Sequence, residues 1–170
     1  MTVVDVDGLS FEFPEDWRVA KFDAWGFYRD RWCRMGDGIK ATDLLALDPS
    51  RVAWFVEVKD YRTQRRTKSI DLVDEVAAKV FDTLAALLPA AIGATDHQER
   101  GLAKAVLGAT RLRVVLHLEQ PKSHSKLFPR RFDPAHLKQK LRQRVRAIDA
   151  HPAVIERGRM GGVGWILAGK

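Results

Sequence analysis

Three charged side chains stand inside two otherwise apolar runs between residues 39 and 62, and this segment constrains the fold most strongly. Asp43 interrupts the first run, and Glu57 and Lys59 close the second. Burying an unpaired charge is costly, so buried charged groups are normally paired with an opposite charge or bound to a metal. Two carboxylates and a lysine are also the side chains that divalent-metal and phosphate chemistry uses.

The two apolar runs predict two strands, 40–47 and 52–59, joined by a turn that opens with Asp-Pro. Glu57 and Lys59 are two positions apart, so a strand directs both side chains to the same face. A four-residue loop would place Asp43 and Glu57 on opposite faces of the hairpin. A three-residue or five-residue loop, or one bulge, would pair them. Convergence of the three charges therefore requires a loop with an odd number of residues or a local distortion of the hairpin.

The bulk properties predict one domain spanning residues 1–170, large enough to fold around its own core. The hydrophobic content is 46% and the charged content is 30%, which are values typical of globular proteins. No apolar run reaches the roughly 18 residues of a membrane span, and the acidic N-terminus does not resemble a signal peptide. With a single cysteine, Cys33, the chain is expected in the cytoplasm, with no membrane as partner.

The net charge of +7 and the pI near 9.8 favour a polyanionic partner. The basic residues gather in two places. The first basic segment, residues 59–68, follows the acidic motif directly, and the second lies between residues 121 and 146, where Asp133 is the only acid. The alternative is that basic surface merely keeps the protein soluble.

The remaining pattern predicts an α/β fold in which helices flank both faces of a mixed central sheet. The segment 17–35 is ambiguous, because its aromatic residues recur at helical spacing and also suit a strand; we assign it to a helix. Asp133-Pro134 is typical of a helix start. The expected elements outside the central hairpin are a hairpin at 3–13, helices at 17–35, 69–88, 96–107 and 133–148, and strands at 111–118 and 163–168.

An Asp, a β-turn and then Glu-x-Lys on the next strand, followed by a helix, resembles the PD-(D/E)XK nuclease superfamily, which has the restriction-endonuclease-like fold. The acid is Asp43 in Thr42-Asp43-Leu44, without a preceding proline, and the second element is Glu57-Val58-Lys59. The resemblance covers residues 40–61 directly and the order of elements up to residue 118 more loosely.

This resemblance implies an endonuclease that hydrolyses DNA phosphodiester bonds with Mg²⁺ or Mn²⁺. Asp43, Glu57 and the main-chain carbonyl of Val58 would be the metal ligands. Lys59 would be catalytic together with the two acids, and a lysine whose pKa is lowered by burial could exchange protons. Asp23, preferred over Asp30, and Lys79 are possible accessory residues, whereas the Gln-x-x-x-Tyr pattern of the exonuclease-like branch is absent.

The basic segments supply the expected contacts with the DNA backbone, which position a nucleic acid without reading its sequence. These candidates are Arg62, Arg65, Arg66, Lys122, Lys126, Arg130, Arg131 and Arg142. One alternative is a catalytically inactive nucleic-acid-binding or protein-interaction module on the same fold. The chain could also act as a homodimer or as a subunit of a larger assembly. In the blandest interpretation, Glu57 and Lys59 form an ordinary exposed pair on a strand edge.

Three further features favour structural roles. Aromatic residues at helical spacing, here Trp25, Phe27, Tyr28 and Trp32, could stack bases but more often belong to a core. His117 lies in an apolar strand, where a partly buried histidine with satisfied hydrogen bonds is expected. The glycine-rich stretch 161–164 lacks the strand-then-helix context of a phosphate-binding loop and is predicted to be a turn.

Overall fold

The computed structural model describes residues 1–127 and 129–168, which form two sheets and four α-helices within this part of the chain. The strands are β1 (Thr2–Val6), β2 (Leu9–Phe13), β3 (Arg18–Lys21), β4 (Leu44–Leu47), β5 (Val52–Asp60), β6 (Arg111–Glu119), β7 (Ala153–Ile155) and β8 (Ile166–Leu167). The helices are α1 (Gly26–Asp30), α2 (Leu72–Gly93), α3 (His97–Leu107) and α4 (Pro134–Val145), with short 3-10 turns at Phe22–Ala24 and Trp32–Met35.

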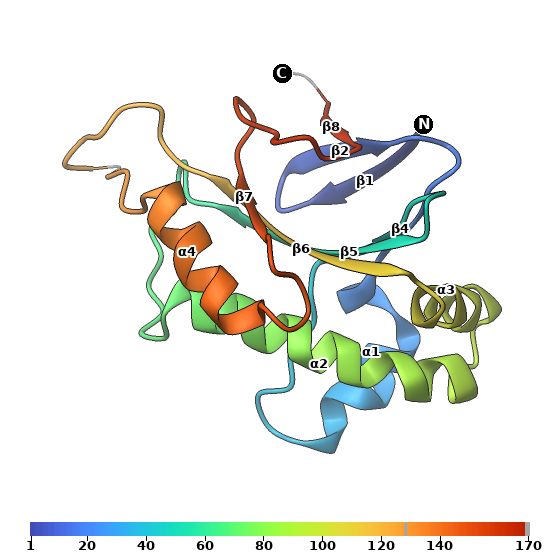
Figure 1. The fold of residues 1–170 in the computed structure, drawn as a ribbon. Coiled ribbons are helices and arrows are strands. Elements are labelled where there is room, and N and C mark those ends of the chain that lie inside the picture. The colour runs from blue at the N-terminus through green and yellow to red at the C-terminus, as the bar shows by residue number, and fades with distance from the viewer. Residues whose placement is uncertain (128, 169–170) are drawn as a thin grey trace.

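The central sheet has the order β3-β4-β5-β6-β7, with antiparallel pairs up to β5 and parallel pairs after it. Figure 1 shows the four helices on one side of this sheet and the small sheet β1-β2-β8 on the other. The predicted mixed α/β fold is confirmed. The prediction that helices cover both faces is wrong, because β8 pairs with β2 and completes a second sheet instead of extending the first.

The turn between β4 and β5 is the odd loop that convergence of the charges requires. Leu47 pairs with Ala53, Asp48 and Val52 close the turn by a backbone hydrogen bond of 3.0 Å, and three residues remain in the loop. Arg51 adopts a φ of 62°, the left-handed position that ends a three-residue hairpin loop. At the other end of the ladder Leu44 pairs with Val56, so the next pair of facing positions is Asp43 and Glu57.

The segment predicted as one helix, 17–35, contains a strand, a five-residue helix and two 3-10 turns. The helix prediction is wrong here because pairing with β4 takes residues 18–21 into the sheet. The aromatic side chains nevertheless belong to the core as expected. Trp25 and Phe27 are buried in the main hydrophobic cluster, and Tyr28 and Trp32 pack against it.

The other helices begin where side chains cap them. Helix α2 starts after Asp71, which accepts a hydrogen bond from the Val73 amide, and therefore three residues after the predicted start at residue 69. The helix runs through Pro89 to Gly93, past the predicted end at residue 88. Helix α3 follows the cap Asp96 within the predicted range 96–107, and α4 is capped by Asp133, as the sequence predicts. Helix α4 ends at residue 145, three residues before the predicted end.

Helix α2 also has the length and apolar composition that could cross a membrane. It is the one such helix in the described residues, and core helices meet the same criterion. In this structure one face of α2 packs beneath the central sheet, where Val76, Val80 and Leu87 are buried. We therefore interpret α2 as a core helix.

An aromatic cluster fills the space between the two sheets. Trp17 stacks on Trp54 at 5.9 Å between ring centroids, and both rings meet Trp165 nearly edge to face. A side chain at Gly164 would collide with the Trp17 ring, so the glycine at this position permits the close approach. The stretch 161–164 forms a turn, as predicted, with Gly161 and Gly162 at positive φ.

Candidate functional site: a buried charge cluster beside a basic surface

The structure brings together the three charges that interrupt the apolar runs. Glu57 is fully buried on β5, and its Oε1 lies 2.7 Å from the Lys59 ammonium. Lys79 reaches the same oxygen from α2 at 2.6 Å and approaches Asp43 Oδ1 at 3.3 Å. An exposed strand-edge pair, the blandest interpretation of Glu57 and Lys59, is therefore excluded.

Asp43 is held by the backbone as well as by Lys79. Its Oδ2 accepts a hydrogen bond of 2.7 Å from the amide of Val58, on the neighbouring strand. Asp23 lies in the 3-10 turn after β3, and its pKa is raised, first by burial and then by repulsion from Asp43. Asp23 and Lys79, the two predicted accessory residues, are thus both placed within electrostatic reach of Asp43.

The interactions within this charge cluster shift the pKa values of Glu57 and Lys59. Burial, followed by repulsion from Asp43, raises the pKa of Glu57 to about 7, although Lys79 and Lys59 partly offset this shift. Burial alone would lower the pKa of Lys59, but attraction from Glu57 and then from Glu75 raises it above the ordinary value. The expectation that Lys59 has a lowered pKa is therefore wrong, because carboxylates surround its ammonium.

The donor set of this cluster fits a divalent cation in part. Two carboxylates converge, and Glu57 Oε2 is a buried oxygen without a hydrogen-bond partner. Such hard oxygen ligands are those that Mg²⁺ prefers. However, the Lys79 ammonium lies between the two acids, and no group of three or more His, Cys, Asp or Glu side chains is positioned for a metal in the described residues.

Glu75 is a charged residue of this cluster that the sequence analysis missed. Its side chain is fully buried in the first turn of α2. The carboxylate forms ion pairs with Arg66 Nη1 at 2.7 Å and Lys68 Nζ at 2.6 Å, and it lies 3.5 Å from Lys59 Nζ. Its pKa is lowered to about 2, because bonds from Lys68 and Arg66 outweigh the effect of burial. The sequence signal for Glu75 is its position four residues before Lys79, on the same helical face.

The predicted nucleic-acid contacts divide into two groups. Four arginines are bound within the protein: Arg62 pairs with Asp60, Arg66 with Glu75 and Arg130 with Glu156, while Arg65 donates to the carbonyl oxygens of Lys126 and Leu127. The side chains of Lys122, Lys126, Arg131 and Arg142 are exposed and have no partner among the described residues. These four are available to an external anion.

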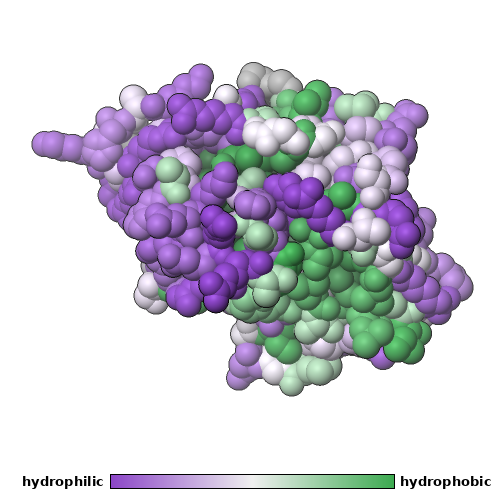
Figure 2. All heavy atoms as spheres, in the orientation of Figure 1, coloured by the Kyte–Doolittle hydropathy of each residue, from purple (hydrophilic) through white to green (hydrophobic). Residues whose placement is uncertain are grey.

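The free basic residues gather at one end of the molecule. Figure 1 shows the second basic segment, here residues 121–127 and 129–132, above α4 and beside the chain that follows β5. The same end is strongly hydrophilic in Figure 2, in contrast with the apolar surface over the second half of α2. On α4 a shallow hollow of about 510 Å³ is lined by Gln139, Arg142, Gln143, Arg146 and Ala150.

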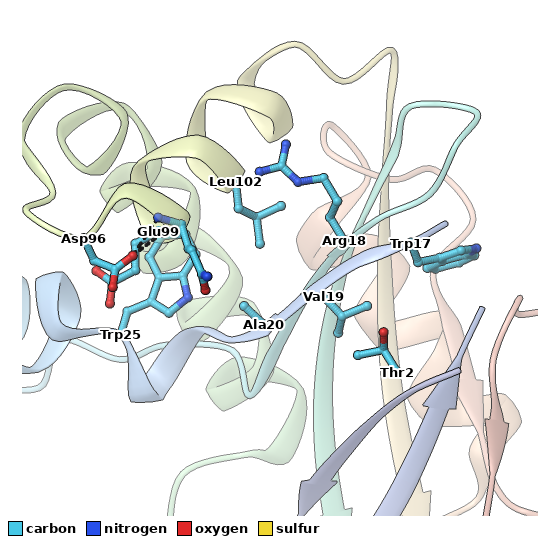
Figure 3. A pocket seen from close by; sticks show the side chains of 10 residues that line it. Thr2, Trp17, Arg18, Val19, Ala20, Trp25, Asp96, Glu99 and Leu102 are labelled. Carbon is cyan, nitrogen blue, oxygen red and sulfur yellow. Dashed lines mark hydrogen bonds between the residues drawn. The ribbon is translucent and has the colours of Figure 1, made fainter. Parts of the chain in front are cut away.

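Two further polar features lie away from this end. A hollow of about 500 Å³ separates β3 from the start of α3, and Figure 3 shows Trp25 and Arg18 on opposite sides of it. The Glu99 carboxylate accepts hydrogen bonds there from the amides of Gly26 and Phe27.

His117 is fully buried beneath the small sheet. Its Nε2 lies 2.8 Å from Glu119 Oε1, and its Nδ1 has no hydrogen-bond partner among the described residues, so the histidine is more buried than predicted and has fewer hydrogen bonds than predicted.

Comparison with known proteins gives one informative similarity. The chain is 29% identical to the cysteine–tRNA ligase of Neisseria meningitidis over 167 aligned residues, which cover 81% of this chain and 24% of that enzyme. The chain thus spans about a quarter of the length of the curated relative it matches. No protein-family model matches the chain, and no solved structure matches it significantly.

This similarity contradicts the assignment to the PD-(D/E)XK nuclease superfamily, and with it the expected hydrolysis of DNA by a magnesium-dependent deoxyribonuclease. The physical reason for the error is that the motif rests on three charges. Asp43, Glu57 and Lys59 meet as the motif requires, yet the same convergence arises in a buried ion-pair network completed by Lys79 and Glu75. The similarity identifies no functional residues, so the roles assigned to individual side chains stay predictions.

The raised pKa of Glu57 predicts a specific pH dependence of stability. Between the unfolded pKa of 4.5 and the folded pKa of about 7, the folded state binds a proton that the unfolded state lacks. Stability conferred by this proton is complete at low pH and is lost as the pH rises through this window. The free energy of unfolding of the wild type should therefore fall by about 3 kcal/mol across it, relative to that of Glu57→Gln.

Urea unfolding at a series of pH values measures this difference. Glu12→Gln, on β2, controls for the removal of a carboxylate outside the cluster. Parallel pH curves for the wild type and Glu57→Gln would contradict the prediction.

Proposed function

We propose that this chain is an RNA-binding domain whose partner is tRNA. The observation that carries the proposal is the concentration of unpaired basic side chains at one end of a protein with a net charge of +7. The relative is a ligase that acts on tRNA, and its similarity supports RNA over DNA as the partner. The proposal concerns binding, because the chain corresponds to a quarter of that enzyme's length.

The geometry of the basic end suits a nucleic-acid backbone. Arg65, from the first basic segment, contacts the second basic segment by donating hydrogen bonds of 2.8 Å and 2.5 Å to the carbonyl of Leu127. This bridge joins the second basic segment, which lies above α4 in Figure 1, to the chain that follows β5. The hollow on α4 adds Arg142 and Arg146, whose planar guanidinium groups bind phosphates through two parallel hydrogen bonds. Such contacts give affinity and orientation without base specificity.

We further propose that the charge cluster binds Mg²⁺ or Mn²⁺ when the Lys79 ammonium withdraws. Asp43 and Glu57 would hold the cation, with the main-chain carbonyl of Val58 as the predicted third ligand. The unpartnered Glu57 Oε2 supports this proposal. When bound, the cation would neutralise carboxylates beside the basic surface and thereby raise its attraction for phosphates.

The chain is also proposed to work in the cytoplasm, as part of a larger assembly or as a homodimer. Support for the larger assembly comes from the partial coverage of the relative, because this chain corresponds to about a quarter of the length of that enzyme.

Fluorescence anisotropy with labelled tRNA tests the RNA proposal. Replacing the exposed Lys122, Lys126 and Arg142 with Gln, one at a time, should weaken binding uniformly across tRNA sequences and lower the salt slope by about 1 for each phosphate contact. Lys104→Gln is the matched control, since this exposed lysine lies on α3 at the opposite end of the molecule. The proposal fails if the wild type does not bind tRNA at low salt, or if the control weakens binding equally.

Manganese binding, followed by electron paramagnetic resonance of free Mn²⁺, tests the cation proposal. Asp43→Asn should abolish the bound fraction, and Lys79→Met should increase it, because the competing ammonium is removed. Asp37→Asn, an exposed acid outside the cluster, should leave binding unchanged. Equal Mn²⁺ binding by the wild type and Asp43→Asn, or no binding by the wild type, is the contrary result.

A further inference from the structure

We propose that Arg66 and Lys68 form a phosphate-binding cradle, which Glu75 occupies until a phosphate of the RNA backbone replaces it. Glu75 would then regulate the basic surface as an internal substitute for the ligand. The inference rests on the proposed function, because it names a subsite of the same RNA-binding surface.

The geometry of the cluster resembles that of a bound anion. Arg66 Nη1 lies 2.7 Å from Glu75 Oε2, and Lys68 Nζ lies 2.6 Å from Oε1. Arg66 also donates to the Tyr61 hydroxyl and to the Ile70 carbonyl, which fix the direction of its guanidinium group. Two cations therefore converge on one small acceptor, as they would on a phosphate.

The charges at this position exceed what one carboxylate neutralises. Arg66 and Lys68 interact with Glu75 as their acidic partner, whereas Lys59 lies closer to Glu57, at 2.7 Å, than to Glu75, at 3.5 Å. A pair of cations facing a single negative charge leaves a net charge of about +1 at the cradle. A phosphate carries more acceptor oxygens than a carboxylate and could satisfy more of the donors.

The position of the cradle connects it with the free basic residues. The chain between β5 and α2 carries Arg65 and Arg66 as neighbours: Arg65 is bound to the second basic segment, and Arg66 to the first turn of α2. The cradle thus lies where the chain before α2 meets the second basic segment of the proposed RNA surface. The Lys68 side chain is 56% exposed, whereas that of Arg66 is 8% exposed and that of Glu75 is fully buried, so an external phosphate would reach the cradle from the Lys68 side.

A purely structural role for Glu75 makes the opposite prediction. If Glu75 only anchors the chain before α2, its removal should loosen that chain and weaken RNA binding. If Glu75 occupies a phosphate cradle, its removal should free two cations and strengthen RNA binding. The sign of the change in affinity therefore separates the two roles.

The test compares Glu75→Gln with Glu12→Gln, on β2 of the small sheet. Both changes remove one negative charge, but Glu12 has no ion-pair partner among the described residues, so its removal frees no cation of the RNA surface. By tRNA anisotropy, Glu75→Gln should bind at least about fivefold more tightly than the wild type, with a salt slope steeper by about 1, and Glu12→Gln should change affinity less than about twofold. Equal affinities for the two variants, or weaker binding by Glu75→Gln, would overturn the inference.

Two additional measurements keep the test decisive. If Glu75→Gln does not fold, Lys68→Gln in the otherwise unchanged protein should weaken tRNA binding about threefold or more with an unaltered unfolding midpoint, and unchanged binding would refute the cradle. If the wild type fails to bind tRNA, the proposed function fails by itself. Calorimetric titration with inorganic phosphate then tests the cradle separately: Glu75→Gln should bind phosphate more tightly than Glu12→Gln, and equal binding refutes it.

Discussion

The register of the β4–β5 hairpin determines which charges meet inside this protein. A three-residue loop places Asp43 beside Glu57, and the Asp43 carboxylate then accepts the Val58 amide and fixes that arrangement. Two acids held together in a buried place require cations, which Lys79 and Lys59 provide. The position of α2 against the sheet, and the path of the chain before it, follow from these ion pairs as well as from the apolar core.

Internal carboxylates also decide how much of the basic charge can act on a partner. Arg62, Arg66 and Arg130 are already paired, so a count of basic residues overstates the charge available to RNA. The unpaired side chains lie on the second basic segment and α4. Glu75 differs from the other carboxylates in this set because it is fully buried and holds more than one cation. Its protonation state is therefore insensitive to pH near neutrality, and only a competing anion would release its partners.

Local signals in the sequence predict the elements that local interactions define. The turn between β4 and β5 and the starts of α3 and α4 could be inferred from neighbouring residues, whereas an odd number of loop residues followed only from the assumption that the charges converge. Strands β3 and β7 could not, because they contain three or four residues and exist through pairing with distant strands. A strand was predicted at the position of β8, but its pairing with β2 in the small sheet could not be inferred locally. The site followed the same rule: the three motif charges were located correctly, whereas the role of Glu75 depends on a fold that brings α2 to β5. The family could not be assigned from three residues, since a buried ion-pair network satisfies the same pattern.

Hydrogen–deuterium exchange of the protein with and without saturating tRNA tests the location of the proposed RNA surface most directly. Binding at the basic end predicts slower exchange in residues 61–71, in the second basic segment and along α4, with little change in β1 and β2. Protection confined to the small sheet or to α3, or no protection anywhere at saturation, would contradict it.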